Sequence, residues 1–182
     1  MEETLLTHLR WINRRLAVAT GIVLLVCAAI VLLDIVLRQL GASLGGTDEI
    51  AGYAMAIATS WGMAYTLLEL GHVRIDVLRS RAQGLMRSVF DLFSMLMLAS
   101  SVSLIALQCW PVLARSLKHS SKANTPLETP LAWVQAPWFA GWVWFAVVAW
   151  LVLVVALVMV FKGEFGRAEA VVGCESEQEK LS

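Results

Sequence analysis

The chain has few charged residues. Asp, Glu, Lys and Arg make up 15% of its 182 residues, and their charges cancel to a formal net charge of zero, whereas soluble domains carry about 25%. Without a net basic or acidic field, the composition gives no reason to expect a nucleic-acid partner. Because 59% of the residues are hydrophobic, the chain falls in the membrane class, where the position of each charge carries the information.

The sequence also lacks the usual signatures of catalysis and metal binding. The three cysteines fall at different expected depths, so a disulfide or a metal site made from them is not expected. None of the three histidines (His8, His72 and His119) lies inside an apolar run, so no pair can hold a haem within a helical bundle. No phosphate loop, CxxC or HExxH spacing occurs. We therefore expect no enzymatic activity, no metal and no cofactor.

What the chain does contain is apolar runs long enough to cross a bilayer, which takes about 20 helical residues. Four such runs lie at roughly residues 16–37, 49–68, 88–108 and 138–161. They predict an all-α integral membrane protein with a single four-helix domain over residues 1–162, followed by a polar tail at 163–182 that we expect to be poorly ordered. The fourth run is bulky on every side, which favours a lipid-facing position.

Positive charge predicts the orientation of the bundle. Most of the 14 Lys and Arg residues lie before the first span, between the second and third, or after the fourth. Cytoplasmic loops carry such an excess, and tryptophans tend to settle at the membrane interfaces. Several of the eight tryptophans lie at those ends of spans three and four that are farther from these basic segments. Both arguments place the two termini in the cytoplasm.

The second expected span is built from small residues. Gly52, Ala56, Ser60 and Ala64 recur every four positions. Small residues at this spacing let helices approach closely in lipid, where no hydrophobic effect drives them together. We interpret this row as a helix-packing or subunit interface.

Polar residues stand at the far ends of spans one and two. Asp34 and Arg38 are four residues apart and can pair on one helix face. A carboxylate inside a membrane span is a functional candidate by default, while a structural ion pair whose arginine reaches the interface is the alternative. Thr47 can cap the second helix, and Asp48 and Glu49 complement its dipole. A contact of these groups with a partner subunit is the alternative to capping, and both can hold together.

The connection after span two, "LELGHVRIDVLRSR", is rich in charge. From Ile75 to Val89, apolar and polar residues separate onto two sides of a helix, which predicts a short amphipathic helix at the cytoplasmic interface. Its Arg79, Arg81 and Arg87 are expected to meet phospholipid headgroups. Glu69, His72, Asp76 and Arg79 step by three or four residues and can form a polar row.

Four segments together resemble the small membrane subunit, DctQ-like, of tripartite ATP-independent periplasmic (TRAP) transporters. They are "DIVLRQL", "DEIAGYAMAIATSWGMAY", "GHVRIDVL" and "TPLETPLAWVQAPW", and the similarity runs from about residue 15 to 160. The resemblance implies that Asp34, Arg38, Glu49, His72, Arg74 and Asp76 are family-motif positions.

The resemblance also implies a role. In such systems a periplasmic binding protein delivers an organic anion to a large membrane subunit, which imports it with a sodium gradient across the bacterial inner membrane. The small subunit holds the large one in the bilayer and helps dock the binding protein, for which Arg115, Lys118 and Lys122 are candidates. The alternatives are a membrane-anchoring subunit of a redox complex and a membrane protein that assembles on its own. The solute is not predicted, because the selecting residues would lie in other chains.

Overall fold

The protein is a bundle of helices. The computed structural model describes residues 2–72 and 85–173, which form α1 (Glu2–Gln39), α2 (Thr47–Leu68), α3 (Leu85–His119), α4 (Leu131–Phe161) and α5 (Phe165–Val172). The predicted all-α class is confirmed. At 1.5 Å per residue the 38 residues of α1 reach about 57 Å, well beyond the roughly 30 Å of a hydrocarbon core.

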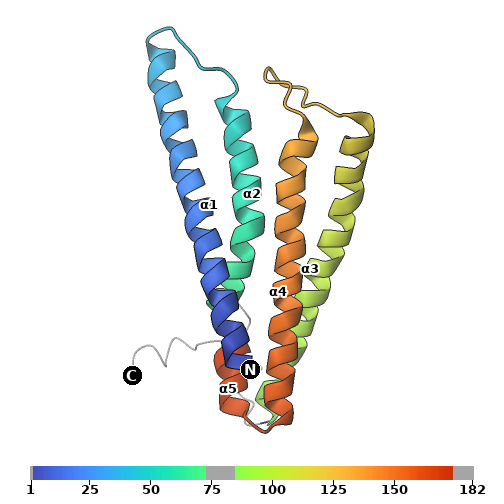
Figure 1. The fold of residues 1–182 in the computed structure, drawn as a ribbon. Coiled ribbons are helices and arrows are strands. Elements are labelled where there is room, and N and C mark those ends of the chain that lie inside the picture. Colours follow the sequence, from blue (N-terminus) through green and yellow to red (C-terminus); the bar gives the residue numbers. More distant parts are fainter. Residues whose placement is uncertain (1, 73–84, 174–182) are drawn as a thin grey trace.

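The long helices run side by side as two hairpins (Figure 1). The first hairpin is α1 with α2, the second is α3 with α4, and α2 packs against α4 to join them. The α1–α2 and α3–α4 loops lie at one end of the bundle, while the N-terminus and α5 lie at the other (Figure 1).

Among the described residues, three helices are long and apolar enough to cross a membrane. These are α1, α3 and α4, which extend past the span limits expected from the sequence. The 22-residue α2 is not among them, because glycine, alanine, serine and threonine take the place of large aliphatic residues along it. The fourth span and the orientation of the termini stay predictions.

The prediction that span four faces lipid is wrong. Half of the residues in the most apolar stretch of α4 are buried, against 6% in α1. The core gathers around α4, with Phe145, Val148 and Ala149 fully buried against Ala64 of α2 and Met95 of α3. Bulky residues on every side fit lipid and protein neighbours equally well, since lipid tails are as apolar as leucine. Helix α1 takes the peripheral place instead.

Indole hydrogen bonds tie α4 to each of the other long helices. Trp61 of α2 donates to the carbonyl of Pro137 at 3.0 Å. Trp150 donates to Ser103 of α3 at 2.9 Å, and Trp144 donates to the amide oxygen of Asn13 in α1 at 3.0 Å. Hydrogen bonds between helices in a membrane contribute about 0.6 to 2 kcal/mol each. They hold α4 at the centre of the bundle.

The first part of the tail is helical, although the sequence predicts that the whole tail is poorly ordered. Residues 165–172 form α5, which buries Ala168 and Val172 against α4 and α3. Its Glu169 pairs with Arg87 of α3 at 2.6 Å, where the sequence predicts a contact of Arg87 with lipid headgroups. Residues 174–182 lie outside the described part.

A second ion pair joins α5 to the N-terminus of α1. Arg167 contacts Glu3 and also Glu164, at 2.8 Å for the latter. The Glu3 carboxylate raises the pKa of the Arg167 guanidinium above its ordinary value. These side chains are about half exposed, so water and salt weaken the pairs, and the buried alanine and valine carry most of the docking of α5.

Replacing Ala168 by aspartate should release α5 while leaving the long helices intact. A buried, unpaired carboxylate is costly, and each 1.4 kcal/mol taken from the local opening free energy raises the open population tenfold. We expect trypsin cleavage after Lys162 and Arg167 to be at least about tenfold faster, followed by mass spectrometry. Ala170→Asp, at an exposed position of the same helix, is the control. Equal cleavage of both variants would mean that α5 is held by something else.

Candidate functional site at the loop end of the bundle

Asp34 is the centre of a polar cluster where α1 meets α2. Its side chain is only 1% exposed. Oδ2 accepts hydrogen bonds from Arg38 Nε at 2.8 Å and from the Thr47 hydroxyl at 2.7 Å. Oδ1 accepts from the Leu44 backbone N–H at 2.7 Å and from the Ser43 hydroxyl at 3.2 Å. An ionised carboxylate offers about four acceptor positions, and the chain itself fills four. The predicted pairing of Asp34 with Arg38 is therefore present.

Glycines shape the loop that closes over Asp34. Two residues after the end of α1, Gly41 has a φ of 79°, and the Ala42 N–H bonds to the carbonyl of Leu37 at 3.0 Å. This is a Schellman end, which reverses the chain and favours glycine in the left-handed position. Gly46 also has a positive φ of 73°, and a Cβ built on it would lie 2.5 Å from Leu127. The segment "GASLGG" thus sets residues 43 and 44 above the carboxylate.

The capping role predicted for Thr47 is wrong. The N-cap of α2 is Gly46, which makes no side-chain cap hydrogen bond, and the buried Thr47 hydroxyl bonds to Asp34 instead. Asp48 and Glu49 do stand in the first turn, where they complement the helix dipole. Asp48 is 85% exposed and lies 3.6 Å from Arg38. Thr47 therefore links α2 to α1.

Glu49 connects α2 with the α3–α4 loop. The Tyr53 hydroxyl donates to its Oε1 at 2.6 Å. The side chains of Thr125 and Thr129 lie near the same carboxylate, although its buried Oε2 has no hydrogen-bond partner. Leu127 of the α3–α4 loop also packs against Gly46 of the α1–α2 loop. These contacts bring the two loops together.

We call the two joined loops, residues 40–46 and 120–130, the loop surface. Within it the Lys122 side chain forms an ion pair with Glu128 at 3.1 Å. The Lys122 backbone forms a single antiparallel β-bridge with Pro130. Arg115 and Lys118 are exposed on the last turns of α3 beside it, and Arg115 Nε donates to the carbonyl of Pro111 at 3.2 Å. The three basic residues predicted for docking thus gather at one end of the bundle, with Lys122 already neutralised by a neighbour.

The row of small residues on α2 divides between two environments. Ser60 and Ala64 are fully buried, and a Cβ added to Gly141 of α4 would come within 2.3 Å of the Ser60 hydroxyl. Ala56 is half-buried, and Gly52 is exposed with nothing near its Cβ position. Ser60 and Ala64 therefore form part of the α2–α4 contact. A subunit interface at Gly52 and Ala56 stays a prediction.

Few of the predicted residues after α2 can be placed. The His72 ring stacks on Phe145 of α4, with centroids 5.8 Å apart, which joins the end of α2 to the core. Arg74, Asp76, Arg79 and Arg81 lie outside the described residues, as does most of the predicted interfacial helix at 75–89. Its last residues, from Leu85, belong to α3.

The arrangement fastens helices and loops to one another. Among residues 2–72 and 85–173, no group of three or more His, Cys, Asp or Glu side chains could hold a metal ion. Asp34 accepts a hydrogen bond from Thr47 of the next helix, and Glu49 accepts one from Tyr53 within α2. The fold and this cluster define a helical membrane protein in which a buried charged group joins two of its own helices.

The family follows from a comparison with known families. The model described as "Tripartite ATP-independent periplasmic transporters, DctQ component" matches residues 27–163, well over half of the chain. The chain belongs to this family, so the resemblance carried by the four sequence segments is confirmed. It is the small membrane component of a TRAP-type transporter, which works with a large membrane subunit and a substrate-binding protein. No curated protein and no solved structure matches the chain.

Proposed function

We propose that this chain is the scaffold subunit of its transporter. It stabilises the large transport subunit in the bacterial inner membrane, with both termini cytoplasmic, and helps dock the periplasmic binding protein during sodium-coupled uptake of an organic anion. Membership of the family supports assembly with the other two components. The scaffold role is supported chiefly by the exposed face of α2.

That face differs from the exposed surface of α1. Gly52, Met55 and Thr59 are all exposed at helical spacing, Met55 by 63%, and Gly62 on the same side has open space at its Cβ position. The exposed surface of α1, by contrast, is rich in large aliphatic side chains such as Leu25. Helix contacts in membranes are rich in small and hydroxyl residues, while lipid accepts bulky ones. We assign the α2 face to a helix of the large subunit.

The double variant Gly52→Leu and Thr59→Leu should weaken this association. Two bulky residues would hold the neighbouring helix away, and a loss of 1.4 kcal/mol lowers the affinity tenfold. We expect the amount of large subunit that copurifies to fall by roughly that factor. The measurement is quantitative mass spectrometry of tagged complexes. Ala19→Leu with Ala29→Leu, at exposed positions of α1, is the matched control. A variant that retains the large subunit as the control does would contradict the assignment.

The loop surface is our candidate for docking. Arg115 and Lys118 are exposed beside it, and its two loops are fastened through the Leu44 N–H bond to Asp34 and the contact of Leu127 with Gly46. Complementary charge acts mainly on the rate of encounter and on its salt dependence. A partner with an acidic patch would meet these groups before any apolar contact forms.

Arg115→Glu is therefore expected to slow uptake at limiting concentrations of binding protein, with a smaller effect at saturation. The difference from the wild type should shrink as ionic strength rises, because salt screens exposed charges. Initial uptake rates in vesicles, titrated with binding protein at two salt concentrations, test this. An equal loss at every concentration and salt level would place the defect elsewhere.

A further inference from the structure

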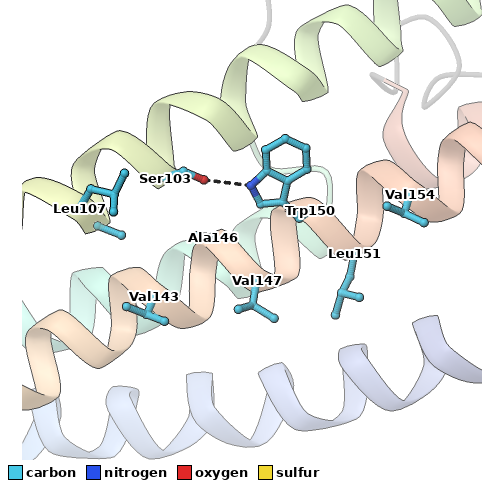
Figure 2. A pocket seen from close by; sticks show the side chains of 9 residues that line it. Ser103, Leu107, Val143, Ala146, Val147, Trp150, Leu151 and Val154 are labelled. Atoms are coloured by element: carbon cyan, nitrogen blue, oxygen red, sulfur yellow. Dashed lines mark hydrogen bonds between the residues drawn. The ribbon is translucent and has the colours of Figure 1, made fainter.

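Two hollows on the described bundle differ in character. The groove between α3 and α4 is apolar, and the indole N–H of Trp150, which reaches across it, is already bonded to Ser103 (Figure 2). A cleft of about 370 Å³ where α1, α4 and α5 meet is lined in part by charged side chains, which are Glu3, Arg10 and Arg167. We propose that this cleft and the arginines beside it bind the acidic segment of the same chain that follows α5, residues 175–179.

The positive charge beside the cleft is not balanced by the described residues. Arg167 contacts both Glu3 and Glu164. Arg10 is exposed, and it forms no ion pair within residues 2–72 and 85–173. Arg14 lies one turn further along the same face of α1 and is also exposed without an ion pair in this part of the chain. We call Arg10 and Arg14 the basic stripe.

The chain that follows α5 starts at this cleft. Ala170 and Val171, in the last turn of α5, line the cleft together with Arg10. Glu175 is four residues beyond Val171, a separation that an extended chain covers with up to about 14 Å. Along α1, Arg10 and Arg14 are only about 6 Å apart. The acidic segment can therefore reach both arginines while α5 stays in place.

The acidic segment carries the charge that the basic stripe lacks. Residues 174–182, which lie outside the described part, read "CESEQEKLS" and contain three glutamates against one lysine. The acidic side chains of α5 and its N-cap are already engaged, Glu169 with Arg87 and Glu164 with Arg167. Exposed ion pairs are weak one by one, but a short flexible tether gives an effective concentration on the order of millimolar. The pairs can therefore persist together.

Carbodiimide coupling of the intact protein tests the contact, because this reagent joins an amine to a carboxylate beside it. Arg10→Lys and, separately, Arg14→Lys keep the positive charge and supply the amine. Arg15→Lys is the matched control, since Arg15 lies over the Trp11 ring on another side of α1. We expect peptides that link position 10 or 14 to residues 175–179, at a yield at least about fivefold above the control. Equal yields for the three variants, or links formed mainly between isotopically distinct chains, would overturn the proposal.

A second measurement separates the acidic segment from other anions. Phenylglyoxal modifies accessible guanidinium groups, and mass spectrometry gives its rate at the basic stripe relative to exposed Arg115. In phosphatidylcholine vesicles, replacing Glu175, Glu177 and Glu179 together by glutamine should raise that rate at least about threefold, and added salt should raise it for the wild type. A rate that the triple variant leaves unchanged would overturn the proposal. Protection that depends instead on added phosphatidylglycerol would assign the stripe to lipid headgroups, and protection that depends on the large subunit would assign it to that partner. Either result also overturns the proposal.

Discussion

Replacing Asp34 by alanine should destabilise the protein more than any other substitution of a charged residue in the described part of the chain. The change removes the acceptor for the Thr47 hydroxyl, the Leu44 N–H, the Ser43 hydroxyl and the Arg38 guanidinium together. A buried donor left without a partner costs about 1–3 kcal/mol, and Thr47 is only 3% exposed. The α1–α2 loop would lose its attachment to α1.

The expected readout is a clear fall in melting temperature, at roughly 2–4 °C per kcal/mol for a protein of this size. The drop should be accompanied by faster proteolysis within residues 40–46. Asp48→Asn is the matched control, because that side chain is 85% exposed and exposed substitutions usually change stability by less than about 0.5 kcal/mol. Asp34→Asn keeps one acceptor oxygen and should fall between the two. Equal melting temperatures for Asp34→Ala and Asp48→Asn would remove Asp34 from the centre of the cluster.

Replacing Gly141 by alanine should separate α2 from α4. The added Cβ would lie 2.3 Å from the Ser60 Oγ, 2.8 Å from its Cβ and 3.0 Å from its backbone carbonyl carbon. The backbone cannot rotate away as a flexible side chain can, so the helices must move apart. Overpacking of this kind costs about 1–3 kcal/mol, and the nearby bond from Trp61 to the Pro137 carbonyl would be strained with it.

The control for Gly141→Ala is Gly21→Ala. Gly21 has no heavy atom within 4 Å of its Cβ position, and alanine is preferred over glycine inside a helix by about 0.5–1 kcal/mol. The two variants should therefore change the melting temperature in opposite directions. Trp61 fluorescence should also shift in Gly141→Ala, as its indole N–H loses its partner. A stabilised Gly141→Ala protein would contradict the close approach of α2 and α4.

The sequence predicted those features that depend on spacing within one helix. The i, i+4 relation placed Asp34 beside Arg38, and the small residues Ser60 and Ala64 predicted a close helix contact. Both relations follow from the geometry of a single helix, and both are present in the structure. The family motifs at 34–40 and 48–65 lie in or beside these contacts.

The sequence could not predict contacts that join distant segments. Thr47 fits a helix cap by local rules, yet its hydroxyl bonds to Asp34 across a glycine turn. The contact of Glu49 with Tyr53 is local, but its position near Thr125 depends on how the two hairpins meet. Asn13 lies in a basic segment, yet it is completely buried and accepts a hydrogen bond from Trp144 of α4.

The position of α4 shows a more general reason for such errors. Outside a membrane, a helix that is apolar on all sides is buried, and inside a membrane it can also face lipid. Hydrophobicity alone therefore cannot tell the centre of a membrane bundle from its rim. Three indole hydrogen bonds and Gly141 distinguish α4 as the centre, and each of these needs the neighbouring helix to be recognised.

The most direct test of the scaffold role is affinity purification of the tagged chain from its own membranes, with every copurifying protein identified and quantified. The measurement does not require knowledge of the solute. We predict a large polytopic membrane subunit in an equimolar ratio, and its loss when Gly52 and Thr59 are both replaced by leucine. Recovery of the chain alone, or with a haem protein in place of a large transport subunit, would contradict the account.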